Sequence, residues 1–244
     1  MKRIAILQSN YIPWKGYFDI ARRVDEFVLF DDARFTRGDW RNRNRIKTAA
    51  GVHWLTIPAD AASTSRIRDV RAADPTWRRR HFTTLENAYS RAPHFRRYRE
   101  ALRELYLGES EVALSAINRR FLEWIQSELG IATPLRWSWE FELVEGRNER
   151  LISICRQAGA TEYLTGPAAR AYLETEKFAA AGVRVLWMSY DGYREYPQLH
   201  GAFEHAVTAL DLLFHLGPES PSYLLPLGRG GLEPSRQVEA APRG

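Results

Sequence analysis

Two short aliphatic runs at the start of the chain constrain its fold most strongly, because a segment with helical periodicity separates them. The runs are residues 3–9 and 26–30, and each ends in polar residues, as expected for short buried strands. Between them, Tyr17, Ile20 and Val24 recur at helical spacing. The pattern predicts a strand–helix–strand unit. The loop after the first strand is then at the carboxyl edge of a sheet, where open α/β sheets bind ligands.

The rest of the chain also alternates between strand and helix patterns. We expect, in order, a hairpin at 45–58, helices at 77–89, 93–106 and 109–129, a strand at 135–141, a helix at 149–158, a strand at 162–165, a helix at 167–180, a strand at 183–188 and a helix at 201–214. This alternation predicts an α/β fold with a parallel or mixed Rossmann-like sheet flanked by helices, and a largely helical middle segment.

The length of 244 residues fits one domain with a sizeable core. We expect residues 1–225 to form a single α/β domain, with a helical insertion at about 75–130. Residues 217–244 contain five Pro and five Gly. This composition predicts a disordered tail at residues 226–244.

Positive charge is concentrated in the first half of the chain. The formal net charge is +5, and all but four of the 35 basic residues are Arg. Residues 34–47 carry six basic side chains against one acidic one, and residues 66–103 carry eleven against four, which leaves the remainder net negative. This distribution predicts an anionic small-molecule partner, such as a nucleotide sugar or a sugar phosphate. The alternative for the second cluster is a solvated basic helix surface.

Several classes of protein are not indicated by the sequence. The single cysteine, Cys155, excludes disulfides within the chain and cysteine-based zinc sites, and the six histidines form no metal signature, so no metal is predicted. No stretch of about 18 apolar residues is present, so no membrane span is expected. The glycine-rich nucleotide motifs are absent too, and no cofactor is identified. We expect a cytoplasmic protein.

Polar residues follow the predicted strands at places where a ligand would bind. Asp31 and Asp32 come directly after the second strand, where a carboxylate can act as a general base or bind a cation, the alternative being a turn or a helix cap. On an extended segment, Asn42 and Asn44 point to one side and Arg43 and Arg45 to the other. The Arg pair can clamp a phosphate or carboxylate. A basic surface strand is the alternative.

Three segments resemble the WbqC-like protein family, which is found among bacterial surface-polysaccharide genes. The matching sequences are IAILQSNYIPWKGYF at 4–18, FDDARFTRGDWRNRNRI at 30–46 followed by HWLTIP at 53–58, and YLTGPAARAYL at 163–173 followed by YPQ at 196–198 and a helix around Asp211. The sequence departs from the family pattern at Ser9, where Pro is usual, at Thr165, where Ser is common, and at 208–209. These departures affect only details of the site.

The resemblance implies a protein of glycan biosynthesis, and glycyl transfer onto an amino sugar has been proposed for the family. It also implies a site among the matching positions, and we assign roles within it. The catalytic candidates are Asp31, Asp32 and His53. The substrate-binding candidates are Gln8, Tyr11, Gly16, Tyr17, Asn42, Arg43, Asn44, Arg45, Gly166, Tyr172, Tyr196 and Gln198.

Three functions remain open at this point. The first is an enzyme that transfers a glycyl or other small acyl group to an amino sugar. In it, Asp31 or Asp32 removes a proton from the amine, and Gln8, His53 or the backbone near Gly166 stabilises the oxyanion. The second is a nucleotidyl-transferring or adenylate-forming enzyme. The third is a non-enzymatic protein that binds sugar nucleotides or RNA. Nucleic acid is otherwise expected only as an aminoacyl-tRNA donor.

Overall fold

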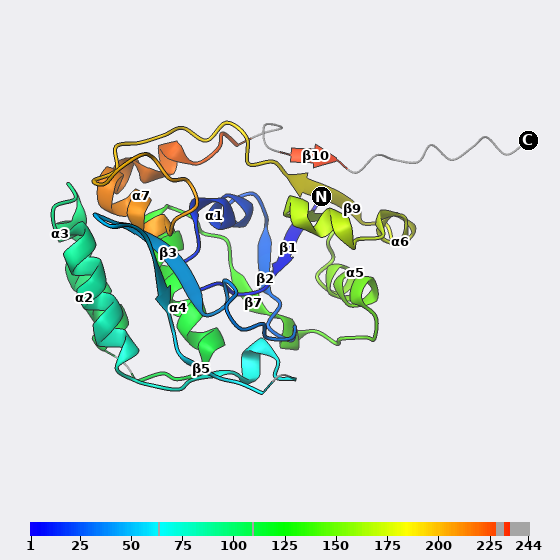
Figure 1. The fold of residues 1–244 in the computed structure, drawn as a ribbon. Helices are drawn as coiled ribbons and strands as arrows, with labels where there is room; N and C mark the ends of the chain where they lie inside the picture. Colours follow the sequence, from blue (N-terminus) through cyan, green and yellow to red (C-terminus); the bar gives the residue numbers. More distant parts are fainter. Residues whose placement is uncertain (63, 109, 228–231, 235–244) are drawn as a thin grey trace, which may run out of the picture.

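A six-stranded sheet forms the centre of the computed structural model, which describes residues 1–62, 64–108, 110–227 and 232–234 (Figure 1). Its strands are β1 (Arg3–Leu7), β2 (Glu26–Leu29), β7 (Leu135–Trp137), β8 (Glu162–Thr165), β9 (Arg184–Met188) and β10 (Leu232–Pro234). They lie in the order β10-β9-β8-β1-β2-β7, and each neighbouring pair is parallel except β9 with β10. The predicted mixed Rossmann-like sheet is confirmed.

Helices cover both faces of the sheet. Successive side chains of a strand point to opposite faces, so each strand contributes to the core on either side. Ala5 of β1 packs in one core with α1 (Lys15–Ala21), whereas Ile4 and Ile6 pack in a second core with α5 (Arg147–Gln157). The helix α6 (Thr175–Ala180) belongs to this second face through Phe178. Figure 1 shows α5 and α6 together, on the side away from α2, α3 and α4.

The middle of the chain is largely helical, as predicted, and it packs on the α1 side of the sheet. Its helices are α2 (Trp77–Tyr89), α3 (Phe95–Leu107) and α4 (Leu114–Glu128), and α7 (Ala209–Leu216) joins them in the same core. The predicted hairpin is present as β3 (Arg43–Thr48) paired with β4 (Gly51–Thr56). The remaining short elements are β5 (Ala59–Asp60), β6 (Arg71–Ala72) and the 3-10 helices η1 (Ile67–Asp69), η2 (Ser138–Glu140), η3 (Pro167–Ala171) and η4 (Gly217–Tyr223).

Four predicted elements differ from the structure. The helix expected at 109–129 begins only at Leu114. The strand expected at 135–141 ends at Trp137 and gives way to η2, which Glu140 stabilises by accepting a hydrogen bond from the Trp137 N–H at 2.7 Å. The helix expected at 167–180 is divided into η3 and α6. The helix expected at 201–214 begins only at Ala209, after Thr208, whose hydroxyl caps it by accepting from the Leu210 N–H.

The last part of the chain is described only in part. Leu232–Pro234 lie in the tail that we expected to be disordered, and they pair with β9 as the antiparallel strand β10. Residues 226 and 227 of the expected disordered segment are described as well, whereas 228–231 and 235–244 lie outside the described residues. Among the helices that the structure describes, none has the length and apolar character needed to cross a membrane.

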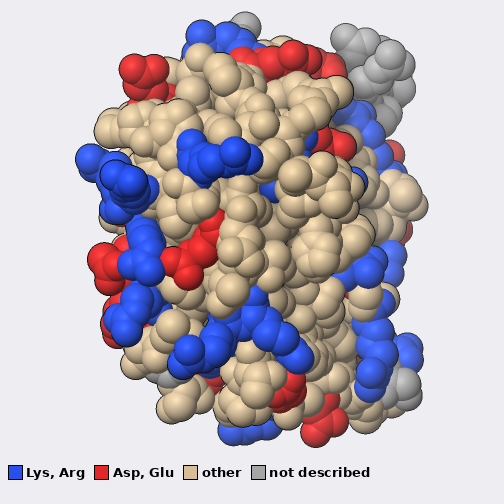
Figure 2. Space-filling model, turned by 60° about the vertical axis from the view of Figure 1, so that its left-hand side comes forward, with Lys and Arg blue, Asp and Glu red and all other residues tan. Residues whose placement is uncertain are grey.

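Many basic side chains of the 66–103 cluster lie beside acidic ones. Arg80 pairs with Asp74 at 2.7 Å, and Arg99 pairs with Glu86 at 2.8 Å and also with Glu100. On the face shown in Figure 2, Lys and Arg form separate groups with Asp and Glu between them. This arrangement favours the interpretation of the 66–103 cluster as a solvated helix surface over its interpretation as a site for an anionic partner.

Candidate anion-binding site

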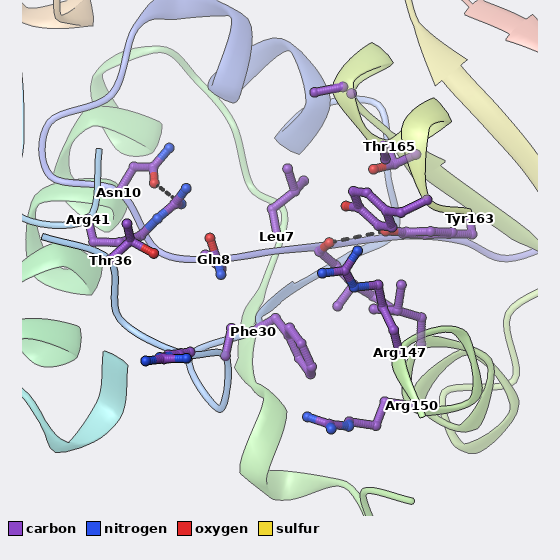
Figure 3. A pocket seen from close by; sticks show the side chains of 18 residues that line it. Leu7, Gln8, Asn10, Phe30, Thr36, Arg41, Arg147, Arg150, Tyr163 and Thr165 are labelled. Carbon is purple, nitrogen blue, oxygen red and sulfur yellow. Dashed lines mark hydrogen bonds between the residues drawn. The ribbon is translucent and has the colours of Figure 1, made fainter. Parts of the chain in front are cut away.

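The order of the strands creates a crevice at the carboxyl edge of the sheet. The chain leaves β1 through α1 on one face to reach β2, and it reaches β8, the other neighbour of β1, through α5 on the opposite face. The carboxyl ends of β1 and β8 therefore lie at a topological switch point, which is where open α/β sheets bind ligands. A cavity of about 690 Å³ opens there (Figure 3).

Four arginines line this cavity, which we call the arginine pocket. Arg34 and Arg41 come from the loop after β2, and Arg147 and Arg150 come from the first turns of α5. No Asp, Glu or Lys is among the lining residues. Guanidinium groups bind phosphate and carboxylate in bidentate fashion. The pocket is therefore complementary to an anion that carries more than one charge.

The two arginines of α5 stand at an unfavourable end of their helix. The amino end of a helix carries partial positive charge, so cations there are destabilising and anions stabilising. Arg147 packs on the Tyr172 ring at 4.7 Å, and neither Arg147 nor Arg150 forms an ion pair within the part of the chain that the structure describes. A bound phosphate would interact favourably with both side chains and with the helix end.

Arg41 forms the opposite wall of the arginine pocket. It donates to the Oδ1 atom of Asn10 and lies 3.5 Å from Asp39 (Figure 3). Its Nε atom is buried without a partner in the described structure, and its backbone carbonyl accepts a hydrogen bond from Asn118. The backbone anchor fixes this residue where its guanidinium faces the cavity.

Three of the predicted site residues line the arginine pocket. Gln8 follows the last residue of β1, Gly166 follows β8, and Tyr172 lies beyond η3. Figure 3 shows the Gln8 amide between the Arg41 wall and the Arg147 wall. Its backbone carbonyl accepts from the hydroxyl of Tyr17 at 3.1 Å, so the predicted residue Tyr17 holds the end of β1 in place.

Asp31 lies outside the pocket lining, fully buried, where its carboxylate joins three elements. It accepts hydrogen bonds from the Ser9 N–H at 2.8 Å, from the Ser9 hydroxyl at 2.7 Å and from the Ser115 hydroxyl at 2.6 Å. Burial raises the pKa of Asp31, and the hydrogen bonds from Ser115 and Ser9 oppose that rise. A proline at position 9 would lack the donated N–H. These contacts hold the first loop against α4, and the general-base role stays a prediction.

We expect the substitution Asp31→Asn to lower the free energy of unfolding by about 1–3 kcal/mol, because an amide nitrogen would replace an acceptor among buried donors. Urea denaturation at pH 7 measures this effect. A general-base role predicts a different result, namely loss of acyl transfer with unchanged stability. Unchanged stability would contradict the positioning role that the three hydrogen bonds indicate.

Asp32 also lies outside the lining of the arginine pocket, and its partners hold it elsewhere. It lies 3.2 Å from Arg66 and 2.9 Å from Arg68, and the Ser138 hydroxyl donates to it at 2.8 Å. Its carboxylate thus connects η1 and η2 to the end of β2. His53 is exposed on β4, opposite Ile46 of β3, and does not line the arginine pocket.

The side chains of segment 42–45 alternate between the interior and the surface, as predicted. Asn42 and Asn44 are buried, and their side-chain amides donate to the carbonyls of Ile57 at 2.8 Å and Tyr11 at 3.0 Å. Arg43 and Arg45 are partly exposed on the other side. The buried pair therefore orders backbone, and neither arginine lines the arginine pocket.

Arg43 and Arg45 instead contact tryptophans. The Arg43 guanidinium lies 4.1 Å from the Trp54 ring, and Arg45 lies 5.9 Å from both Trp54 and Trp40. Such contacts are cation–π interactions. They give this face of the β3–β4 hairpin a mixed cationic and aromatic character.

The other predicted residues are held in the interior of the protein. The Tyr11 hydroxyl bonds with His81 and Tyr106. Tyr196 and Gln198 both donate to the buried carboxylate of Asp211, at 2.7 and 2.8 Å. Their contacts organise the core around α2 and α7.

Gly16 is needed for a close approach. The indole of Trp14 lies over Gly16 so closely that a Cβ atom at this position would collide with it. Any side chain at position 16 would therefore displace Trp14 or move the start of α1.

Arg147 and Arg150 are the main site residues that the sequence analysis missed. The only signal for them was a pair of cations at the start of a predicted helix, where cations are unfavourable. Arg34 and Arg41 belong to the predicted basic cluster at 34–47, although our prediction centred on Arg43 and Arg45.

Two further reactive side chains lie elsewhere. Cys155 is buried in α5, and burial raises its pKa to about 12, so it is not a nucleophile at neutral pH. Lys15 is enclosed by the rings of Tyr193, Tyr196 and Phe203, and burial lowers its pKa to about 8. Among the described residues, no group of three or more His, Cys, Asp or Glu side chains could hold a metal ion.

The fold and the cavity define an α/β protein with an arginine-lined cavity at the switch point of its sheet. The sequence matches the model of the WbqC-like protein family over residues 8–223, and the chain belongs to this family. It is 49% identical over 226 residues to an uncharacterized protein of Mycobacterium tuberculosis. The aligned region covers 92% of this chain and 98% of that relative. No solved structure matches the chain.

Proposed function

We propose that this protein binds a phosphate-bearing sugar, such as a nucleotide-linked amino sugar, in the arginine pocket. We further propose that it transfers a glycyl or other small acyl group to the amine of that sugar during surface-glycan biosynthesis in the cytoplasm. The observation that carries the proposal is the convergence of Arg34, Arg41, Arg147 and Arg150 on one cavity with no acidic lining residue.

The size and position of the arginine pocket also support a nucleotide-sized ligand. Its volume of about 690 Å³ lies within the range of roughly 300–1,000 Å³ that is common for small-molecule sites. The aliphatic and aromatic walls, among them Leu7, Phe30 and Leu151, would cover the apolar parts of such a ligand.

Acyl transfer requires little beyond positioning and stabilisation of an oxyanion. The neutral amine attacks the carbonyl carbon of an activated acyl donor, a C–N bond forms, and the bond to the leaving group breaks. The nitrogen loses its extra proton to a base. The Gln8 amide and backbone N–H groups near Gly166 are the donors that could stabilise the developing oxyanion.

The test is calorimetry with UDP-, GDP- and dTDP-linked amino hexoses and the matching nucleoside diphosphates. Hydrogen bonds to charged groups contribute about 1.5–3 kcal/mol each, so Arg147→Ala and Arg150→Ala should each weaken binding at least tenfold. The double variant should weaken it about 100-fold or more. Product formation is then followed by mass spectrometry, with an acyl adenylate, an aminoacyl-tRNA or a thioester as donor.

Arg156→Ala is the matched control for this experiment. Arg156 is an exposed arginine of the same helix, near its carboxyl end and outside the pocket lining, so the charge change is identical. Equal losses in Arg147→Ala and Arg156→Ala would show a non-specific charge effect. Binding of RNA with a steep salt dependence, and of no nucleotide sugar, would contradict the proposal.

A further inference from the structure

A second, smaller cavity adjoins the arginine pocket. Its volume is about 200 Å³, and its walls are Pro13, Trp14, Trp40, Asn44 and Ala206 together with Asn10. We call it the tryptophan cavity. It is smaller than the roughly 300–1,000 Å³ of pockets for drug-sized ligands, so it suits a single ring or a short chain.

The structure holds both tryptophans of this cavity in place. Trp14 lies over Gly16 and packs edge-on against Tyr190 and Tyr193, with ring centroids 4.8 and 5.8 Å away. Such aromatic contacts restrict the indole to one orientation. An aromatic wall that is fixed before a ligand binds loses little conformational entropy when the ligand packs on it.

Trp40 is positioned from two sides. Its backbone carbonyl accepts a hydrogen bond from the Tyr11 N–H at 3.0 Å, and its ring lies 5.3 Å from that of Trp54. Even so, 38% of Trp40 is exposed to solvent. Because Trp40 also lines the tryptophan cavity, part of its ring is open to a ligand there.

Asn10 is the shared wall between the two cavities, because it lines both. Its Oδ1 atom accepts from Arg41 of the arginine pocket, and its amide nitrogen forms no hydrogen bond within the described residues. The side chain thus connects a cation that faces one cavity with a free donor beside the other. The amide of Asn44, by contrast, is already used by backbone groups.

We propose that the tryptophan cavity is the subsite for the sugar ring, with the apolar face of a hexose packed on Trp14 and Trp40, while the arginine pocket binds the phosphates. This inference rests on the proposed function, because it divides that ligand between the two cavities. The Asn10 amide nitrogen donates to a ring hydroxyl, and Asn10 and Arg41 lie where sugar and phosphate meet.

The chemistry of the walls favours a sugar over a nucleobase. A base needs several donors and acceptors around its edge to be recognised, and this cavity offers one free amide nitrogen. A hexose has one face of C–H groups and a rim of hydroxyls that water can satisfy at an open cavity. The larger arginine pocket then has room for the nucleoside part beside Tyr172.

The test uses calorimetry to compare two ligands on one variant. The ligands are the nucleotide sugar that binds most tightly in the test of the proposed function and its nucleoside diphosphate. Trp40→Ala should weaken binding of the nucleotide sugar about tenfold, the effect of one stacking contact together with its buried area. Binding of the nucleoside diphosphate should stay within about twofold of wild type. Trp40→Phe should recover most of the loss.

Trp139→Ala is the matched control, because Trp139 is also 38% exposed and stacks on Trp137 away from both cavities. Equal weakening of both ligands by Trp40→Ala would place the nucleoside in the cavity and overturn the sugar subsite. No weakening of either ligand would also overturn it, while leaving the proposed function intact. Failure of every nucleotide ligand to bind the wild type would overturn both.

Discussion

Replacing Asp211 by alanine is expected to lower the free energy of unfolding by about 3–5 kcal/mol, because it removes the acceptor of several buried hydrogen bonds. The carboxylate is fully buried at the start of α7. It accepts from the hydroxyl of Tyr89 at 2.9 Å, from the hydroxyl of Tyr196 at 2.7 Å and from the Gln198 amide at 2.8 Å. Each donor would be left without its partner.

The effect should extend beyond α7, since the donors come from separate parts of the chain. Tyr89 also accepts a hydrogen bond from the Lys47 N–H of β3, and the Lys47 ammonium donates to Gln198 at 2.7 Å. The carboxylate therefore connects α2, the β3–β4 hairpin and the segment before α7. Burial, and after it the charge of Asp211, raises the pKa of both Tyr89 and Tyr196, which keeps these hydroxyls as donors.

Thermal and urea denaturation at pH 7 measure the loss. Asp211→Asn should be intermediate, because the amide oxygen still accepts but the amide nitrogen faces donors. Asp191→Ala is the control, since Asp191 is exposed and bonds only with nearby Ser189 in the described structure. Equal stability of Asp211→Ala and Asp191→Ala would contradict the role of Asp211 as the centre of this network.

Local patterns predicted the elements whose hydrogen bonds stay within a helix or a sheet. The alternation at 42–45 correctly gave two buried amides and two outward arginines, because a strand has a strict period of two. The opening strand–helix–strand unit and the parallel order of its strands followed from the same kind of reasoning. The periodicity of the sequence is sufficient to predict a strand or helix that only has to bury one apolar face.

The helix predicted from residue 201 failed because the backbone of this segment bonds elsewhere. Glu204 exchanges hydrogen bonds with the side chain of Gln198, and the N–H groups of Thr208 and Ala209 donate to the carbonyls of Arg45 and Pro13. Arg45 and Pro13 come from distant parts of the sequence. The spacing of apolar residues cannot reveal them.

The sequence predicted the edge of the sheet at which the arginine pocket lies better than it predicted the residues that line it. The loop after β1, which we expected at the carboxyl edge of the sheet, contributes Gln8 and Asn10 to the lining, and Gly166 after β8 lines the pocket too. Arg147 and Arg150 could not be recognised, because only the folded sheet brings the start of α5 beside β1. The side chain of Asp31 is engaged by Ser115, 84 residues away, which no local pattern indicates.

Acidification should destabilise the protein through His81 of α2. Burial lowers the pKa of His81 from its ordinary value of 6.5 to about 4. Its Nε2 atom lies 3.2 Å from the Thr56 carbonyl, which can only accept, so Nε2 carries the hydrogen. The Nδ1 atom then accepts from the Tyr11 hydroxyl at 2.9 Å. The neutral ring satisfies both partners, whereas protonation would place a positive charge on a ring that is buried away from water.

The sign of the pH effect follows from this difference in pKa. Above pH 6.5 the ring is neutral in both the folded and the unfolded chain, and its full stabilisation is present. Between pH 6.5 and about 4 the unfolded chain binds a proton that the folded chain does not, so the free energy of unfolding falls with falling pH. A shift of this size corresponds to about 3 kcal/mol in all.

Urea denaturation between pH 7 and 4 measures this slope. His81→Phe should be less stable at pH 7, because the Tyr11 hydroxyl and the Thr56 carbonyl lose a partner, but its stability should fall less steeply on acidification. Tyr11→Phe is the matched control, since it removes one hydrogen bond from the same ring and leaves His81 able to titrate. It should lose stability at every pH and keep the steep slope. If His81→Phe kept the wild-type slope, the acid sensitivity would have to come from other buried groups, because a phenyl ring cannot bind the proton.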